Sequence, residues 1–277
     1  MAFSRGNFSR QEGAIRQGFR RGTAEIARAL RLAPRNNGGE LHASTKKSLE
    51  KQADRIVREG IQQASDKIRA NIESHTRRVI RAQIRTLTGM GIPPPTLKQI
   101  NELVANASRN AMTRPFPGTD TNNIQRLGAI GARTRKLYQE ALEAPKNELR
   151  GALDKLRRGA HDPKPGNTRV DGGSSSKAIA RINRTEQARA AREAVLSLGA
   201  QLGFNFVYWR LSGLHKSYGG REICEKLTAA TGPDVRGKLN RLGIDLSSVD
   251  LQGLFSLEAL PNIPHPNCMC FQEMWHP

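Results

Sequence analysis

The chain has 277 residues, which suffices for one large domain or two ordinary ones, and its formal net charge is +20. This excess of positive charge favours a polyanionic partner, and aromatic residues, which could be buried in a core, make up only 5% of the chain. A solvated, Arg-rich helical surface would have the same composition. No apolar run approaches the roughly 20 residues that a membrane span needs, and the first ten residues lack the hydrophobic core of a signal peptide. The chain has three cysteines, which cannot all pair within it, and two of them stand in Cys268-Met269-Cys270, a spacing that would strain a disulfide. The cysteines therefore favour a reducing compartment.

Residues 1–43 are predicted to form a basic, flexible arm. Arg and Gly are frequent there, and a short helix is expected from Thr23 to Leu32, ending at Pro34. The run Asn36-Asn37-Gly38-Gly39 then breaks the chain.

Residues 44–158 are predicted to form a helical region. From Ser44 to Leu87, apolar and small residues recur every three or four positions, which predicts one long amphipathic helix. A second helix fits residues 96–112, where Thr96 can cap its start. The pattern over 123–158 contains Pro145, which removes an amide donor and should kink or split the helix near Ala144. The apolar stripes are narrow, so these helices should pack as a bundle or in a homo-oligomer.

Residues 159–176 are predicted to be a linker between two domains. The segment is rich in Gly, Pro, Ser and charge and has no apolar periodicity.

Residues 177–277 are predicted to form a small mixed domain. A helix is expected from Lys177 to Leu202, with Gly203 at its C-terminal end, and a strand from Phe204 to Leu211. A short helix around 221–230 and a further loop and helix up to Leu260 should follow. The expected fold class is therefore mainly α with a small α+β C-terminal domain.

Four residues form a set of candidate zinc ligands, namely Cys224, His265, Cys268 and Cys270. Thiolate and imidazole are the donors that a tetrahedral structural zinc prefers, and three prolines hold the approach to the last two cysteines extended. His215 is a substitute if Cys224 points elsewhere. The alternative is that the cysteines are small buried side chains that merely pack.

Several motifs follow one another within roughly residues 178–271. They are a predicted helix with Arg184-Thr185-Glu186, a predicted strand with Trp209, Cys224 after Glu222-Ile223, and a terminal His-Pro-Asn-Cys-x-Cys. In this order they resemble the Mu F-like minor head proteins of tailed phages. This sequence departs from the family at Met269, where a basic residue is usual. The resemblance implies a structural protein of the virion head, assembled in the host cytoplasm and present in few copies near the portal. It would act in head assembly, DNA packaging or DNA delivery, with the portal and other capsid or scaffold proteins as partners.

Two residues of this motif have open roles. Arg184 and Glu186 point to different faces of their helix, so each needs a partner elsewhere. Glu186 could be an acid or base, but a role in packing through bonds to backbone or Arg side chains is favoured. Trp209 is interpreted as a core anchor.

The arginines Arg77, Arg78, Arg81 and Arg85 offer phosphate contacts without base-reading geometry. A DNA-binding architectural protein with no sequence preference is therefore an alternative function. The sequence has no phosphate loop, nucleophile elbow or His-Glu-x-x-His, so no enzyme is predicted. A third hypothesis, a metal-dependent enzyme, would need an open coordination position in the Cys/His cluster.

Overall fold

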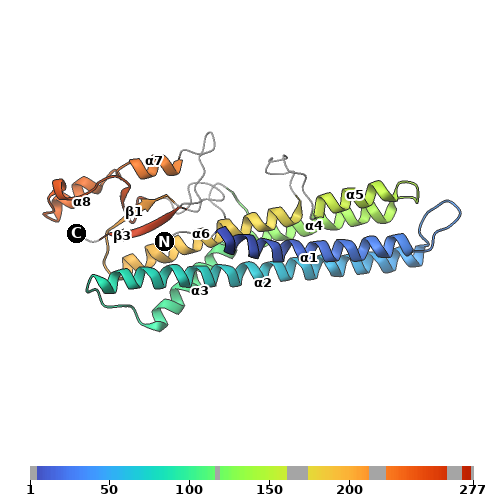
Figure 1. The fold of residues 1–277 in the computed structure, drawn as a ribbon, viewed down its shortest axis with the longest axis horizontal. Coiled ribbons are helices and arrows are strands. Elements are labelled where there is room, and N and C mark those ends of the chain that lie inside the picture. The colour runs from blue at the N-terminus through green and yellow to red at the C-terminus, as the bar shows by residue number, and fades with distance from the viewer. Residues whose placement is uncertain (1–4, 116–118, 161–173, 212–222, 261–269, 276–277) are drawn as a thin grey trace. The chain divides into compact units, whose positions relative to one another are not determined.

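The computed structural model describes residues 5–115, 119–160, 174–211, 223–260 and 270–275. The chain is mainly helical, with a three-stranded antiparallel sheet near its C-terminus (Figure 1), which confirms the expectation of a mainly helical protein with strands in its C-terminal part. The helices are α1 (Arg5–Leu32), α2 (Ala43–Gly89), α3 (Leu97–Thr113), α4 (Asn123–Glu143), α5 (Leu149–Ala160), α6 (Ser175–Gln201), α7 (Ile223–Ala229) and α8 (Val235–Arg241). A 3₁₀ turn, η1 (Leu246–Ser248), and the strands β1 (Phe206–Arg210), β2 (Leu254–Ser256) and β3 (Phe271–Trp275) complete them.

The chain divides into two compact units. The bundle unit comprises residues 6–68 and 119–182, and the sheet unit comprises residues 1–5, 69–118 and 183–277. Two helices, α2 and α6, each contribute residues to both units. This division differs from the one expected at residues 159–176, of which 161–173 lie outside the described residues. Because α2 and α6 continue from one unit into the other as helices, the sequence has no Gly- or Pro-rich linker at these unit boundaries.

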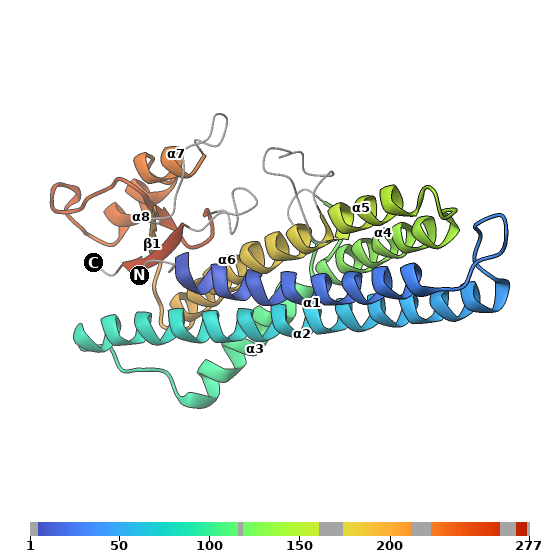
Figure 2. The same cartoon turned by 45° about the vertical axis from the view of Figure 1, so that its right-hand side comes forward.

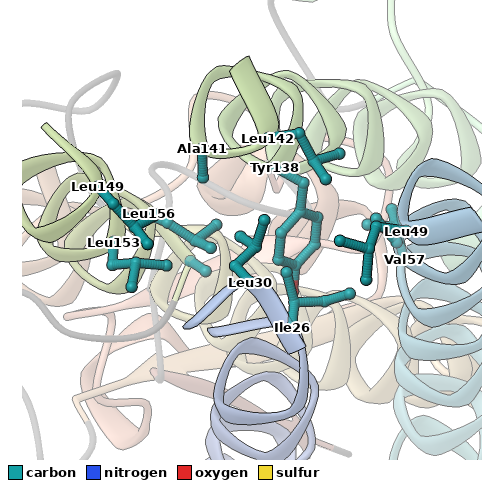
Figure 3. Close-up of a cluster of buried hydrophobic side chains, with 12 residues drawn as sticks. Ile26, Leu30, Leu49, Val57, Tyr138, Ala141, Leu142, Leu149, Leu153 and Leu156 are labelled. Atoms are coloured by element: carbon teal, nitrogen blue, oxygen red, sulfur yellow. The ribbon is translucent and has the colours of Figure 1, made fainter. Parts of the chain in front are cut away.

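The bundle unit is built on an apolar seam between α1, α2, α4 and α5, which run side by side in Figure 2. Ile26 and Leu30 of α1 point toward Tyr138 of α4, with leucines of α5 closing the other side (Figure 3). The buried members are Ile26, Leu30, Leu49, Ala53, Val57, Tyr138, Ala141, Leu142, Leu149, Leu153, Leu156 and Ala160. Burying each large side chain contributes about 1.5–3 kcal/mol, so this seam is the main source of the unit's stability.

Glycines let helices approach closely in this bundle. A Cβ added at Gly22 of α1 would lie 2.6 Å from Cγ2 of Ile56 on α2. A Cβ at Gly131 of α4 would lie 3.2 Å from Cγ1 of Ile61, also on α2. Larger residues at either position would have to displace an α2 isoleucine.

The N-terminal segment differs from the flexible arm that was expected. Residues 5–32 form one continuous helix, α1, whose Ile26 and Leu30 are fully buried. The following loop is held to the α4–α5 turn, because Nη1 of Arg35 donates to the carbonyls of Gly39 at 2.7 Å and Ala144 at 3.0 Å. Core packing of one helical face therefore orders a segment whose composition is that of an arm.

The helix ends follow the local sequence. Thr96 starts α3 and Asn122 starts α4, each through a reciprocal capping box with a Gln three residues later. Ala144 is extended before Pro145, so the predicted third helix splits into α4 and α5. Gly203 has φ of 78° after α6, which confirms the predicted C-terminal stop.

The sheet has the strand order β2-β1-β3. Phe206 and Tyr208 of β1 face α8 and pack with Val235, Leu239 and Leu254, while Trp275 of β3 packs edge-on against both aromatics. On the other face, a Cβ at Gly199 of α6 would lie 3.4 Å from Sδ of Met274 in β3. Helices thus cover both faces of the sheet, and all of β1 except Arg210 is buried.

The region after α7 departs from the expected loop and helix up to Leu260. It contains the short helix α8, the turn η1 and strand β2, and β3 follows near the C-terminus. Strands of three and five residues carry too little alternation to be recognised without their partner β1.

No helix in the described part of the chain combines the length and hydropathy that a membrane crossing needs.

Candidate functional site

The part of α6 that belongs to the sheet unit buries polar and charged side chains. Each of the following is at most 4% exposed: Asn183, Thr185, Glu186, Gln187, Arg189 and Arg192. Glu and Arg are almost never buried this completely unless they are paired. Their partners therefore show what this face of α6 does.

Arg189 joins α6 to the end of α3. Its Nε lies 3.2 Å from Oε2 of Glu186, one turn earlier on α6. Its Nη2 donates to the carbonyls of Asn110 at 2.8 Å and Arg114 at 3.2 Å, and Nη1 donates to that of Pro115 at 3.3 Å. A cation is favourable where a helix leaves its last carbonyls unbonded. The planar guanidinium reaches several acceptors at once, which Lys cannot do.

Glu193 supports the same end of α3. Its Oε1 accepts a hydrogen bond from Nδ2 of Asn110 and lies 3.8 Å from Nη1 of Arg114. Two side chains of opposite charge on α6 thus fix the position at which α3 ends.

Arg192 joins α6 to the sheet. Its guanidinium lies 5.6 Å from the ring centroid of Trp209 in β1, within range of a cation–π interaction. Its Nη1 also donates to the carbonyl of Cys270 at 2.7 Å, immediately before β3. Trp209 is fully buried, as the core-anchor interpretation requires.

Polar contacts from α2 complete this region. Nδ2 of Asn71 donates to Oδ1 of Asn183 on α6 at 3.0 Å, and Nε2 of Gln83 donates to the carbonyl of Gln272 in β3 at 3.3 Å. His75 of α2 is buried, and burial together with the nearby Arg78 charge lowers its pKa to about 3. Its imidazole is therefore neutral at ordinary pH and serves packing rather than charge pairing.

The arginines suggested for DNA contact lie on α2. Arg78, Arg81 and Arg85 are exposed, whereas Arg77 is half-buried and donates from Nη1 to Oδ1 of Asn101 on α3. One of the four therefore has a structural contact.

The candidate zinc ligands fall into two groups. Cys224, on α7, and Cys270, just before β3, are both buried in the sheet unit. His265 and Cys268, like the substitute His215, lie outside the described residues. Among the residues that are described, no group of three or more His, Cys, Asp or Glu is placed to hold a metal ion.

The motif residues Arg184, Thr185 and Glu186 lie on α6 as expected, and the buried Glu186 carboxylate faces an arginine of its own helix. Sequence reasoning missed Arg189 and Arg192, which carry the contacts between α6, α3 and the sheet. The spacing of three residues from Glu186 to Arg189 was a visible signal, because such pairs meet on a helix.

The chain matches no protein-family model, no curated protein and no solved structure. Its functional interpretation therefore rests on the motif residues and on the contacts described above.

Proposed function

We propose that this chain is a non-enzymatic structural protein of a tailed-phage head, similar to the Mu F-like minor head proteins. One observation supports it most: two residues of the motif that are far apart in the sequence, Trp209 and Cys270, contact the same side chain. Arg192, two turns after Glu186, contacts both Trp209 and the carbonyl of Cys270. The motif thus acts as a clamp that holds α6, β1 and the start of β3 together.

The chemistry of this clamp supports a structural role. The Glu186 carboxylate is fully buried and paired with Arg189. The Nη1 and Nη2 atoms of Arg189 donate hydrogen bonds to carbonyls at the end of α3 and in the residues that follow. A catalytic acid or base needs hydrogen-bond reach to a substrate proton. The clamp instead fixes the arrangement of a small domain, which is what a component assembling near a portal requires.

The clamp function extends to a zinc ion at the C-terminus. Support for it comes from Cys224 and Cys270, which are buried on segments that adjoin the same strand, since α7 contacts β1 and β3 pairs with β1. Together with His265 and Cys268 they would supply four soft or borderline donors, and a bound zinc would add folding free energy. Elemental analysis of the wild type and of Cys224→Ser with Cys270→Ser checks this. About one zinc per chain, lost in the variant together with chelator-sensitive melting, is expected, and zinc-free wild type would contradict it.

Co-sedimentation tests the head function. The tagged chain is produced together with the portal and major capsid genes expected beside its own gene, and particles are separated on a density gradient. A few copies of the chain per particle are expected in the head fraction, whereas a chain that remains at the top of the gradient would contradict the proposal. The control is the same gradient without the portal gene, from which the chain should be lost.

A second candidate function is DNA binding without sequence preference. The exposed Arg78, Arg81 and Arg85 lie three and four residues apart, on one face of α2. Such a face can contact phosphates but does not read bases.

A further inference from the structure

Two neighbouring hollows between α1 and α5 gather basic side chains of the bundle unit. The first, of about 490 Å³, is lined by Arg20, Arg28, Arg31 and Arg157 and by the carboxylate of Asp154. The second, of about 610 Å³, is lined by Arg31, Arg35, Lys146 and Arg150. Arg31 and Leu153 line both hollows, so we treat the two as one surface and name it the α1–α5 groove.

The groove follows from how residues are spaced on the two helices. On α1, the short side chains of Thr23, Ala24 and Ala27 line the first hollow between Arg20 and Arg31. Spacings of three and four residues place all of these on one helix face. Thr23 is buried, whereas Arg20 and Arg31 are exposed, and the short side chains between the two arginines leave room for a bulky anionic group to approach the helix.

The charge of the groove is not balanced by its own residues. Of the lining residues that the structure describes, seven are basic and one, Asp154, is a carboxylate. Except for the half-buried Arg35, all seven are exposed. Like charges held this close repel one another, so an anionic partner is favoured, and more so at low salt.

We propose that the α1–α5 groove binds the phosphate backbone of duplex DNA. Guanidinium groups match phosphate geometry with two parallel hydrogen bonds. The arginines of α1 extend over 11 residues, or about 16 Å of helix, and duplex DNA presents a phosphate about every 3.4 Å along each strand. Among the side chains that the structure describes, no aromatic one lines either hollow, whereas single strands are bound largely through aromatic stacking. The proposal rests on the second candidate function and assigns it to a surface other than the α2 arginines.

A second copy of the chain is the main rival occupant. A third hollow, at the α4–α5 turn, is lined by Glu140, Glu143 and Glu148 together with Lys155. Lys155 pairs with Glu140, and Lys46 of α2 lies 3.6 Å from Glu143. Two of these three carboxylates therefore already have a basic partner, which leaves little negative charge on this surface to pair with the seven basic side chains of another copy's groove. A polyanion supplies that charge, so it fits the groove better than a second copy does.

Fluorescence anisotropy with a 24-base-pair duplex of arbitrary sequence, titrated from about 50 to 300 mM NaCl, tests the proposal. The groove variant is Arg28→Gln with Arg31→Gln, and the matched control is Arg81→Gln with Arg85→Gln on α2, which removes the same charge. The groove variant should weaken binding about tenfold or more at 100 mM NaCl and lower the salt slope by about 2. The control should retain the wild-type slope. Asp154→Asn should tighten binding about threefold, because it removes the one repulsive carboxylate.

The outcomes separate the site from the function. If the control loses affinity as much as the groove variant or more, DNA binding stands but the groove is not its site. If the wild type fails to bind duplex at 50 mM NaCl, both the function and the groove assignment fall. Sedimentation velocity under the same conditions measures self-association and so tests whether a second copy of the chain occupies the groove. If the groove variant loses self-association while keeping its affinity for DNA, the occupant is a second copy. All variants replace exposed side chains and should melt within about 2 °C of wild type.

Discussion

The two units of this protein use arginine in opposite ways. In the bundle unit the core is made of Leu, Ile, Val, Ala and Tyr, and its arginines stay at the surface or at its edge. In the sheet unit two arginines and a glutamate are at most 4% exposed and hold α3, α6 and the sheet together. Among the described residues, all charged side chains buried to this degree belong to the sheet unit.

The difference lies in what the buried side chains connect. The bundle aligns long helices whose leucines can fill a continuous seam. The sheet unit also buries apolar side chains, but it joins α3, α6 and a sheet of short strands through buried arginines, whose guanidinium groups reach several acceptors. An apolar core tolerates the exchange of one apolar side chain for another of similar volume at a small cost in stability. Removing one partner of a buried ion pair costs more, because the other charge stays buried without a partner. The following predictions test that contrast.

Arg189→Met should have the largest effect, destabilising the sheet unit by about 3–5 kcal/mol. It leaves the Glu186 carboxylate buried without its arginine and removes the side-chain donor that three carbonyls share. Urea unfolding followed by circular dichroism measures it. Adding Glu186→Leu should restore much of the loss, because the buried charge then disappears too. The matched control is Arg236→Met on the surface of α8, which should change stability by less than about 0.5 kcal/mol. Equal effects of the two methionine variants would contradict the clamp.

Leu156→Ala should cost about 3 kcal/mol in the bundle unit. Its side chain is fully buried in the seam, so truncation leaves a cavity. Leu32→Ala removes the same atoms from a residue that is 74% exposed and should be close to neutral. Thermal melts of both variants compare them. If both leucines were equally tolerant, the seam would not be the core of this unit.

Acid should destabilise the fold through His75, by about 2 kcal/mol at pH 5 relative to pH 7. Burial and Arg78 hold its pKa at about 3 in the folded chain, against an ordinary value of 6.5. Between these values the unfolded chain binds the proton and the folded chain does not, so stability falls as pH drops below 6.5. Urea midpoints of wild type and His75→Leu at both pH values measure it, and the variant should lose this part of the pH dependence. His42→Leu, at an exposed position, should keep it.

Arg192→Lys should have the smallest effect, about 1 kcal/mol. Lys keeps the positive charge but loses the planar group that covers the Trp209 ring and reaches the Cys270 carbonyl. Tryptophan fluorescence should also change, since Trp209 loses its cation–π partner. Unchanged emission and stability would show that a point charge suffices at this position. Arg181→Lys, half-buried on the same helix, is the control.

Much of the fold was readable from the chain. Thr96, Pro145 and Gly203 are local signals for helix starts and stops, and the structure confirms all three. Only the C-terminal part of α1, from Thr23 to Leu32, was predicted, because Arg and Gly dominate the composition of the preceding residues. Its apolar residues Phe8, Ile15, Phe19, Ile26 and Leu30 nevertheless recur at spacings of seven and four, which is a helical pattern. Strands β2 and β3 were missed because each depends on hydrogen bonds to β1.

The candidate site was only partly readable. Glu186 and Trp209 could be singled out by their resemblance to a family motif, but Arg189 and Arg192 stood among eight arginines of residues 175–241. Only the spacing of Arg189 from Glu186 was a local signal, and nothing local marked Arg192. What distinguishes them is their partners on α3, β1 and beside Cys270, which are distant in sequence.

The sequence by itself determined the helical periodicity, the caps and breaks that bound most helices, the excess of positive charge and the residues of the C-terminal motif. These depend on interactions within a few residues of one another, which a local pattern records. Only the tertiary structure decided which arginines are buried, which line the α1–α5 groove, and that α2 and α6 each serve two units. Those properties arise from contacts between segments up to 189 residues apart, such as that of Gln83 with Gln272. Burial is a property of the packed chain rather than of any one segment.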